Sequence, residues 1–334
     1  MAKLNVTVAC GEYDRTRALI AGRVQAEGAD LNVLNISNAW ARHQRMLMHE
    51  EFDVCELSTS SFLLARDEGR EFVGLPVFPY RMFRHGYVWC SAKAAIRTPA
   101  DLRGKRIGVG MYQITTAIWV RGFLQHDYGL RPEDLVWVTE LPELVPLRGA
   151  LRAAIEPLPP GRSCEEMLLS GELDAYIAVE GTPLGFRANP AVHRLFPDYR
   201  AVEMEYFRRT RCFPIMHTLV VRRRLLDAHP WLAVSLVDAF RASKREALAQ
   251  ASFPRASSLA WYSTYQDAER ELLGDDPYPY NWADTRHVID AICAYSHEQG
   301  IVGRRFAPEE LFASSTLDYP EKGGQQGGRI QRDA

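Results

Sequence analysis

The chain has 334 residues, of which 47% are hydrophobic and 25% are charged, and its formal net charge is −2. This composition is typical of a folded protein with two domains or one elaborate α/β domain, and it excludes a disordered chain. The charge balance gives no basic footprint for nucleic acid. No apolar run approaches the roughly 18 residues that a membrane helix needs.

The N-terminal segment and the cysteines indicate the compartment. "MAKLNVTVACGEYD" has one lysine, no long apolar stretch and no small-residue cleavage pattern, so we expect no signal peptide. The six cysteines are far apart and lack CxxC spacing. In a chain of this size this pattern favours reduced, buried thiols in the cytoplasm over a zinc site.

The first section of the chain alternates predicted strands and helices. A strand-like alternation begins at residue 4 and stops at Gly11, and apolar runs with strand or helix spacing follow it. The predicted strands cover 4–10, 29–37, 52–58 and 72–78, and the predicted helices cover 16–20, 40–49 and 60–69. This order favours a mostly parallel sheet with helices on its faces.

The second section repeats the alternation and then becomes mainly helical. Thr98 fits a helix N-cap, with Pro99 at the first helical position. Strands are predicted at 106–109, 135–140, 172–179 and 213–221, and helices at 115–128, 164–170 and 230–250, with further helices up to about 312. The glycine- and glutamine-rich tail, 320–334, is expected to be disordered.

Two α/β units in series, followed by a helical part, predict a two-lobe fold with a ligand cleft between the lobes. We expect the chain to cross between the lobes near 78–87 and again near 206–214. The predicted bounds are 1–85 together with 212–319 for the first lobe, and 86–211 for the second lobe.

Three polar segments follow predicted strands and are expected to face the ligand. They are "GEYDR" after the first strand, "LSTSS" at a helix start, and "GVGMYQITTA", which lacks a complete phosphate-loop motif. Backbone N–H groups and hydroxyls at a helix N-terminus bind anions, although ordinary helix capping would also explain these residues. The candidates are Glu12, Asp14, Arg15, Ser60, Ser61, Tyr112, Gln113 and Thr115.

Two further segments combine histidine with arginine. "PVFPYRMFRHGYVW" places Arg81, Arg84 and His85 within five positions, and His217 interrupts the apolar strand in "FPIMHT". A lone histidine in such a strand is usually a core residue. If both histidines share one space with an arginine, the arginine can hold a carboxylate and an imidazole can transfer a proton near neutral pH. These segments therefore predict chemistry on an acidic small molecule.

Eight segments, in order, give the chain a resemblance to a known family. They are "VACGEYDRTRALIAGRV", "PVFPYRMFRH", "DLRGKRIGV", "AIWVRGFLQHDYGLRPEDLVWVT", "SGELDAYI", "RLFPDYR", "YFRRTRCFPIMHTLVVRR" and "YSHEQGIVGRRFAPEELF". With them the chain resembles the 4,5-dihydroxyphthalate decarboxylase family from about residue 4 to residue 317. The resemblance implies an α/β, two-lobe, type II periplasmic-binding-protein-like fold, with a mixed, mostly parallel sheet flanked by helices in each lobe.

The resemblance also implies non-oxidative decarboxylation of a hydroxylated aromatic acid. Such chemistry requires protonation of the ring carbon that bears the departing carboxylate, and cations that hold the carboxylates. By this resemblance, His85 or His217 donates the proton and the other orients a phenolic oxygen. The remaining expected roles are carboxylate binding by Arg15, Arg81 and Arg84, and contact with the phenols by Glu12 or Asp14.

Two segments depart from the family pattern and leave the substrate open. "VEGTP" brings Glu180 to a turn where an alanine, or an arginine, followed by alanine and proline is usual, and Gly110 and Met111 replace a usual Pro-Glu pair. Both changes fall near the predicted cleft, so a different aromatic or heteroaromatic acid in a biosynthetic pathway is an alternative substrate. Glu180 would then pair with an amino group on that substrate.

The sequence also leaves the class of protein open. A non-catalytic solute-binding protein for an aromatic acid fits the same fold, although it requires export. No cofactor is expected, but a divalent metal held by His85, His217 and a carboxylate stays open. A homo-oligomer also fits a chain of this size.

Overall fold

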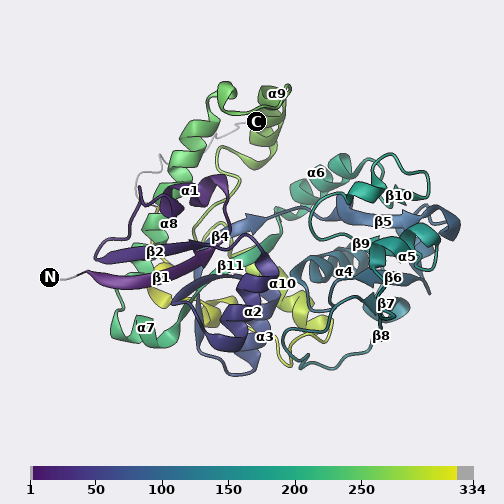
Figure 1. The fold of residues 1–334 in the computed structure, drawn as a ribbon, viewed down its shortest axis with the longest axis horizontal. Coiled ribbons are helices and arrows are strands. Elements are labelled where there is room, and N and C mark those ends of the chain that lie inside the picture. Colours follow the sequence, from purple (N-terminus) through teal and green to yellow (C-terminus); the bar gives the residue numbers. More distant parts are fainter. Residues whose placement is uncertain (1–2, 322–334) are drawn as a thin grey trace, which may run out of the picture.

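The computed structural model describes residues 3–321 of the chain. Within this range, two β-sheets lie side by side and each is surrounded by helices (Figure 1). We call the part around the sheet that contains β1 the first lobe, and the part around the other sheet the second lobe. The predicted disordered tail, 320–334, lies outside the described residues except for its first two positions.

The sheet of the first lobe has the spatial order β2–β1–β3–β11–β4. β1 is parallel to β2 and β3, whereas β11 is antiparallel to both of its neighbours. The strands are β1 (Leu4–Cys10), β2 (Ala29–Asn35), β3 (Val54–Ser58), β4 (Phe72–Arg81) and β11 (Ile215–Arg222). Because β11 comes late in the chain, two distant segments build this sheet.

The sheet of the second lobe has the order β10–β5–β9–β6–β7–β8. β6 is parallel to β7 and β9, and β7 is parallel to β8, whereas β5 is antiparallel to β9 and β10. The strands are β5 (Val88–Ser91), β6 (Arg106–Val109), β7 (Val136–Thr139), β8 (Ala154–Pro157), β9 (Ala175–Ile177) and β10 (Val192–Arg194). Both sheets are thus mixed, as the two-lobe prediction required.

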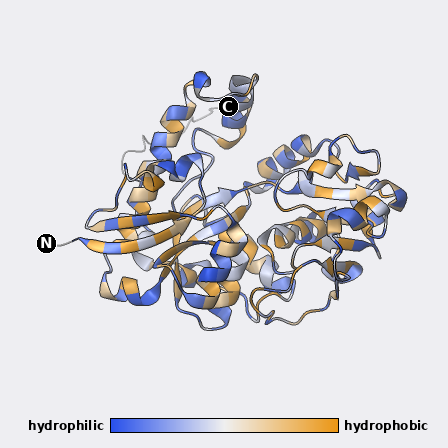
Figure 2. Ribbon diagram, viewed as in Figure 1, coloured by the Kyte–Doolittle hydropathy of each residue, from blue (hydrophilic) through white to orange (hydrophobic). Residues whose placement is uncertain are grey.

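The helices cover the sheets and also join the lobes. They are α1 (Arg17–Ile20), α2 (Ala39–His49), α3 (Thr59–Asp67), α4 (Thr115–Tyr128), α5 (Cys164–Ser170), α6 (Tyr199–Thr210), α7 (Arg223–Ala228), α8 (Leu232–Ala251), α9 (Tyr262–Leu273) and α10 (Arg286–Glu298). α4 lies beside α3 and α10. One hydrophobic core therefore continues from Phe62 on α3 through Ile118 on α4 to Ile289 on α10. Hydrophobic residues, drawn in orange, are found in the strands of both lobes (Figure 2).

The chain passes from the first sheet to the second over residues 82–87 and returns over 211–214. The two crossings are bonded to each other, because the Met82 N–H donates to the Pro214 carbonyl at 3.0 Å. Arg81 adds two bonds, from its Nε and Nη2 to the Phe213 carbonyl, at 3.2 and 2.9 Å. The exact bounds of the lobes stay a prediction.

Most predicted strands and helices are found close to their expected positions. β1, β6, α4 and α5 have the predicted bounds, and the other predicted strands differ by a few residues at their ends. The prediction did not include the short strands β5, β8 and β10.

Candidate active site between the two lobes

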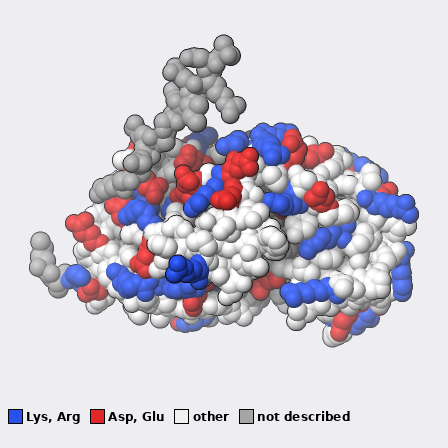
Figure 3. Space-filling view, turned by 90° about the horizontal axis from the view of Figure 1, so that it is seen from above, with Lys and Arg blue, Asp and Glu red and all other residues white. Residues whose placement is uncertain are grey.

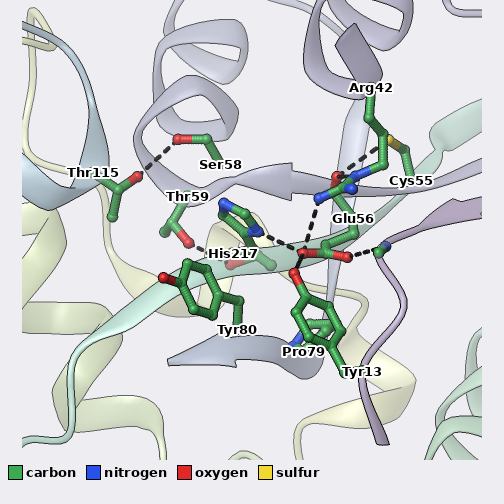
Figure 4. A network of polar contacts seen from close by, with 12 residues as sticks. Tyr13, Arg42, Cys55, Glu56, Ser58, Thr59, Pro79, Tyr80, Thr115 and His217 are labelled. Atoms are coloured by element: carbon green, nitrogen blue, oxygen red, sulfur yellow. Dashed lines mark hydrogen bonds and ion pairs between the residues drawn. The ribbon is translucent and has the colours of Figure 1, made fainter. Parts of the chain in front are cut away.

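The carboxylate of Glu56, a fully buried glutamate on β3, is contacted by four polar groups of the first lobe (Figure 4). Its carboxylate accepts hydrogen bonds from the backbone N–H of Gly11 at 2.8 Å and from the Tyr13 hydroxyl at 2.7 Å. It also contacts Arg42 Nη2 at 3.0 Å and His217 Nδ1 at 2.5 Å. A buried carboxylate with this many donors is held in one position.

The strand register brings His217 to this carboxylate. His217 on β11 lies opposite Ser58 on β3 on one side and opposite Tyr80 on β4 on the other. Because side chains alternate along a strand, Glu56 and Ser58 point to the same face of β3. Glu56 and His217 are therefore diagonal neighbours on one face of the sheet, although 161 positions separate them in sequence.

The charges in this group decide the protonation states. Burial raises the pKa of Glu56, but the Arg42 guanidinium, His217 and the Gly11 N–H together hold this pKa well below its usual range. Burial, with smaller effects of the Arg42 and Arg84 charges, lowers the pKa of His217 below its usual value, although Glu56 acts in the opposite direction. An ionised carboxylate can only accept a hydrogen bond, so Nδ1 of His217 carries a proton and donates it to Glu56. The other ring nitrogen, Nε2, does not contact Glu56, so it can take up or donate a proton.

Two aromatic rings surround the imidazole of His217. The ring of Tyr80 lies 5.0 Å from it between centroids, and the ring of His43, on α2, lies 4.9 Å from it, nearly perpendicular. His43 is 6% exposed, and its Nε2 has no hydrogen-bond partner among residues 3–321. Burial lowers the pKa of His43 well below its usual value, so this second imidazole is neutral.

A cluster of hydroxyls joins the two lobes next to His217. The Thr115 hydroxyl, at the start of α4, lies 2.8 Å from the Ser58 hydroxyl and 2.9 Å from the Ser60 hydroxyl. It also accepts a hydrogen bond from the backbone N–H of Ser60 at 3.0 Å. The N-termini of α3 and α4 therefore converge here. Their N-cap residues, Ser58 and Ile114, make no side-chain cap, and Thr115 accepts one first-turn N–H of α3 instead. Two helix N-termini and their hydroxyls favour an anion at this point.

Arg84 brings a buried positive charge to the same junction. Its side chain donates to the Val179 carbonyl of the second lobe at 2.8 Å and to the Tyr80 hydroxyl of the first at 3.3 Å. Arg84 is only 1% exposed, and no carboxylate of residues 3–321 lies within ion-pair distance of its guanidinium. Its charge is close enough to His217 to lower the pKa of that imidazole.

His85 lies in different surroundings from His217. Its ring stacks on Phe123 at 4.0 Å and also contacts Phe196 and Tyr206, and it lines a groove beside α4 and α6. Burial and the nearby Arg209 lower the pKa of His85 to about 3. The expected sharing of one space by the two histidines is not found: His85 packs on rings from α4 and α6, whereas His217 contacts His43, Tyr80 and Glu56.

The other two predicted arginines have partners within the chain. The Nε of Arg15 donates to the Pro79 carbonyl at 2.7 Å, and its guanidinium lies 4.0 Å from the Tyr278 ring. Arg81 donates to the Phe213 carbonyl, as described above. Both cations thus hold backbone carbonyls of the first lobe and of the crossings. Buried carbonyls need such donors, which a sequence does not reveal.

The remaining candidates are divided between the junction and the surface. Glu12 and Asp14 are exposed and pair with Asn35, Arg15 and Arg17. Glu180 is also exposed, in the turn after β9.

The other candidates are buried. Ser61 lies one residue beyond Ser60 on α3. Tyr112 and Gln113 are buried, and their backbone N–H groups donate to Glu143 at 2.7 and 2.9 Å. A carboxylate does bind these amides, but it belongs to the protein.

The sequence analysis did not name Glu56, Arg42, His43 or Tyr80 as site residues. The signal for Glu56 was present, because within "FDVCELS" the apolar run that follows Asp53 is interrupted by this carboxylate. A buried carboxylate requires a cation or several donors. The sequence could not show that the cation is Arg42, since a fully buried arginine on an amphipathic helix has no distinctive pattern.

The described residues do not form a metal centre of the usual kind. Between residues 3 and 321, no group of three or more His, Cys, Asp or Glu side chains could hold a metal ion. The same range contains no helix long and apolar enough to cross a membrane.

Comparison with solved structures relates the fold to periplasmic binding proteins. The alkanesulfonate-binding protein SsuA of Xanthomonas axonopodis pv. citri matches with a TM-score of 0.56 at 14% identity, over 93% of this chain and 98% of that chain. The aliphatic sulphonate binding protein SsuA of Escherichia coli matches with a TM-score of 0.53 at 10% identity, over 94% and 99%. The chain therefore has the expected two-lobe fold of these proteins.

Comparison with curated proteins identifies the family. A 4,5-dihydroxyphthalate decarboxylase of Pseudomonas putida is 35% identical over 215 residues, which are 62% of this chain and 83% of that protein. One of Comamonas testosteroni is 38% identical over 327 residues, or 95% of this chain and 99% of that protein. No family model matches the chain. With this identity along nearly its whole length, the chain belongs to the 4,5-dihydroxyphthalate decarboxylase family.

Proposed function

We propose that the protein is a carboxy-lyase that removes one carboxylate from a hydroxylated aromatic diacid of the 4,5-dihydroxyphthalate type. The two curated relatives carry this activity in their names. The reaction site that we propose is the junction described above, formed by Glu56, His217, Arg84 and the hydroxyl cluster of Ser58, Ser60 and Thr115.

The observation that carries the proposal is the charge of Arg84. Burying a guanidinium is costly, and the groups of residues 3–321 that contact Arg84 are all uncharged: the Val179 carbonyl, the Tyr80 hydroxyl, the Met216 sulfur and two tyrosine rings. A carboxylate of the substrate supplies the missing charge and accepts two hydrogen bonds from the planar guanidinium. Since Arg84 already contacts both lobes, a ligand bound there is held between them.

The second carboxylate of a diacid fits the hydroxyl cluster. Ser58, Ser60 and Thr115 present hydroxyls beside the N-termini of α3 and α4. These groups stabilise an anion without supplying a full positive charge. A carboxylate held by a weaker site keeps more of its electron density, and it can leave as neutral carbon dioxide more readily than one paired with arginine.

We propose that His217 delivers the proton. The incoming dianion favours protonation of this imidazole, and the resulting imidazolium is stabilised by Glu56 through Nδ1. Nε2 then gives its proton to the ring carbon that bears the leaving carboxylate. As the carbon–carbon bond breaks, its electron pair stays with the ring, carbon dioxide departs and His217 returns to its neutral form. A phenolic hydroxyl para to that carbon stabilises the positive charge in the protonated ring.

The partner and compartment are also proposals. On the face seen from above, acidic and basic side chains are interspersed, which supports a small molecule as the partner and not a nucleic acid (Figure 3). All six cysteines are unpaired and buried, which supports a reducing compartment, and we propose that the protein acts in the cytoplasm.

The test is a decarboxylation assay with three ligands. Purified protein is incubated with 4,5-dihydroxyphthalate, with phthalate and with an amino-substituted hydroxybenzoate, and carbon dioxide release and binding are measured. We expect turnover of the first, and binding of phthalate without turnover because it lacks the para hydroxyl. Binding of all three without carbon dioxide release would instead favour a solute-binding protein. Turnover of the amino-substituted compound alone would favour the biosynthetic alternative.

A further inference from the structure

The reaction proposed above gives no role to a second buried imidazole of the site, that of His43 on α2. Its ring lies 4.9 Å from the ring of His217 between centroids and is nearly perpendicular to it. The side chain is only 6% exposed, yet its Nε2 has no hydrogen-bond partner among residues 3–321. A buried polar atom without a partner costs free energy, unless a bound group satisfies it. This nitrogen therefore points to a ligand.

The carboxylate of Glu56 is already fully used and cannot accept a hydroxyl of the substrate as well. An ionised carboxylate has about four lone-pair sites. Glu56 receives the Gly11 N–H, the Tyr13 hydroxyl, the Arg42 guanidinium and Nδ1 of His217 (Figure 4). A phenolic hydroxyl that enters the site must therefore donate its hydrogen bond to another group.

The other polar group next to His217 on the sheet is also engaged. The Tyr80 hydroxyl donates to the Met82 sulfur at 3.5 Å and accepts from Arg84 at 3.3 Å. Nε2 of His43, by contrast, is buried and has no partner, so neither protein nor solvent competes for it. Beside His217, the imidazole of His43 is the acceptor that is left for a phenol.

The charge state of His43 suits this task. Burial, with smaller effects of the His217 and Arg42 charges, lowers the pKa of His43 well below its usual value. The ring is therefore neutral and offers one nitrogen as an acceptor. So weak a base only accepts a hydrogen bond from an ordinary phenol, but it can take the proton once the aromatic ring is protonated and its hydroxyl becomes strongly acidic. Its help is thus concentrated in the transition state.

We propose that Nε2 of His43 accepts the substrate hydroxyl para to the departing carboxylate and takes its proton during the reaction. The inference rests on the proposed function and makes His43 a second catalytic residue of the same site. Because His43 and His217 are in contact but belong to different elements, α2 and β11, one substrate ring can meet both imidazoles. His43 thus takes the phenol-binding place that the sequence analysis expected for one of His85 and His217.

The proton and electron balance of the step is closed. As His217 protonates the ring carbon, the O–H bond of the para hydroxyl breaks, its proton passes to Nε2 of His43, and its electron pair forms the carbonyl of a dienone. When the carbon–carbon bond breaks, its electron pair restores the aromatic ring and leaves a phenolate, while carbon dioxide departs. The phenolate takes the proton back, and both imidazoles are neutral again.

Steady-state kinetics with 4,5-dihydroxyphthalate test the catalytic part of the proposal. His43→Ala should lower kcat by about 100-fold, within the usual contribution of acid–base catalysis. Free imidazole added to the assay should restore part of the rate, because it can replace the missing ring. His43→Gln keeps an acceptor that cannot take a proton, so kcat should fall similarly while KM stays close to that of the wild type. The matched control is His49→Ala, an exposed histidine of the same helix, which should leave kcat unchanged.

Calorimetric titration separates this proposal from the proposed function, because it requires no turnover. In the His217→Gln background, adding His43→Ala should weaken the binding of 4,5-dihydroxyphthalate about fivefold, the contribution of one neutral hydrogen bond. The affinity for phthalate, which has no hydroxyl, should be unchanged. If the wild-type chain released no carbon dioxide, the proposed function would fail, and these two affinities would still decide whether His43 accepts the hydroxyl.

Three results would overturn the proposal. The first is a wild-type kcat in folded His43→Ala or His43→Gln, with the fold verified by circular dichroism. The second is a loss of kcat in His43→Ala that free imidazole does not reduce. The third is an equal loss of affinity for phthalate and for 4,5-dihydroxyphthalate, because His43 would then only support the packing around His217.

Discussion

At the scale of single residues, the candidate chemistry depends on which nitrogen of His217 is free. Glu56 is ionised and accepts the Nδ1 proton, so the carboxylate selects one tautomer and orients the ring. Arg42 balances the charge of Glu56, and the pair can therefore stay buried when His217 is neutral. The arrangement has the form of an acid–base residue that a second residue holds in position.

Replacement of His217 separates the two histidines of the sequence analysis. We expect His217→Gln to lower kcat by about 10²- to 10⁴-fold, the usual contribution of a proton donor. His85→Gln should retain most of the activity, because His85 packs among Phe123, Phe196 and Tyr206. Steady-state kinetics of both variants, with circular dichroism to verify folding, decide the matter. Equal losses in the two folded variants would contradict the assignment.

The pH dependence follows from the lowered pKa of His217. In the free enzyme the imidazole of His217 is neutral at pH 7. It must therefore take up one proton from solution when the substrate binds, before it can act as the donor. We therefore expect kcat/KM to fall about tenfold per pH unit between pH 6.5 and pH 8. Initial rates at low substrate concentration in buffers of constant ionic strength measure this slope. A flat profile across the interval would argue against His217 as the proton donor.

The role of Arg84 predicts a change in substrate affinity. A hydrogen bond to a charged group contributes about 1.5–3 kcal/mol, so Arg84→Gln should raise KM by roughly 10- to 100-fold. Arg84→Lys should recover part of this loss, since it keeps the charge but not the planar fork. The matched control is Arg148→Gln, because Arg148 is half-exposed and 3.8 Å from Asp67. An unchanged KM in Arg84→Gln would remove this residue from the substrate site.

At the scale of secondary-structure elements, the site depends on β11 lying between β3 and β4. That antiparallel insertion places His217 opposite Ser58 and Tyr80. The starts of α3 and α4 then close the site from two lobes, through Thr115 and Ser60. The sequence did predict hydroxyls at these helix starts, because the change from strand to helix after "LSTSS" and "GVGMYQ" is a local pattern.

The buried ion pair between β3 and α2 predicts an effect on stability. Glu56→Gln leaves Arg42 buried without a counter-charge, and we expect a loss of about 3–5 kcal/mol in the free energy of unfolding. Arg42→Met combined with Glu56→Gln should recover part of it. Because the pKa of Glu56 is depressed in the folded state, its contribution is present above about pH 4.3, its unfolded pKa, and is lost as the pH falls further.

Urea denaturation of these variants at pH 7 and pH 4 measures both effects. The difference between wild type and Glu56→Gln should be smaller at pH 4. If Glu56→Gln were as stable as the wild type at pH 7, the carboxylate would not be the organising charge of the site.

At the scale of the whole molecule, the crossings and the shared core decide how the lobes meet. Arg81 bonds one crossing to the other through Phe213, and the core runs through α3, α4 and α10. Arg15 similarly holds the Pro79 carbonyl just before the first crossing. These two arginines thus act on the backbone that connects the lobes, while Arg84 alone of the three predicted arginines contacts both lobes at the junction.

Removal of metal ions is a prediction for the molecule as a whole. Since residues 3–321 contain no group of three or more metal-ligating side chains, we expect decarboxylation to be unchanged after dialysis against a chelator. The assay compares carbon dioxide release before dialysis, after it, and after addition of Mg²⁺, Mn²⁺ or Zn²⁺. Activity that disappears with the chelator and returns with one cation would instead support the metal-assisted alternative.

The sequence by itself determined the order of elements, the two-lobe fold and the family, because these follow from local hydrophobic periodicity and from long matched segments. It also identified His217, Ser60, Thr115 and Arg84 as polar residues in unusual places. Only the tertiary structure decided that His217 meets Glu56 while His85 packs among aromatic rings. The reason is physical: partners 161 positions apart are chosen by strand pairing, and a buried charge leaves no local trace of its counter-ion.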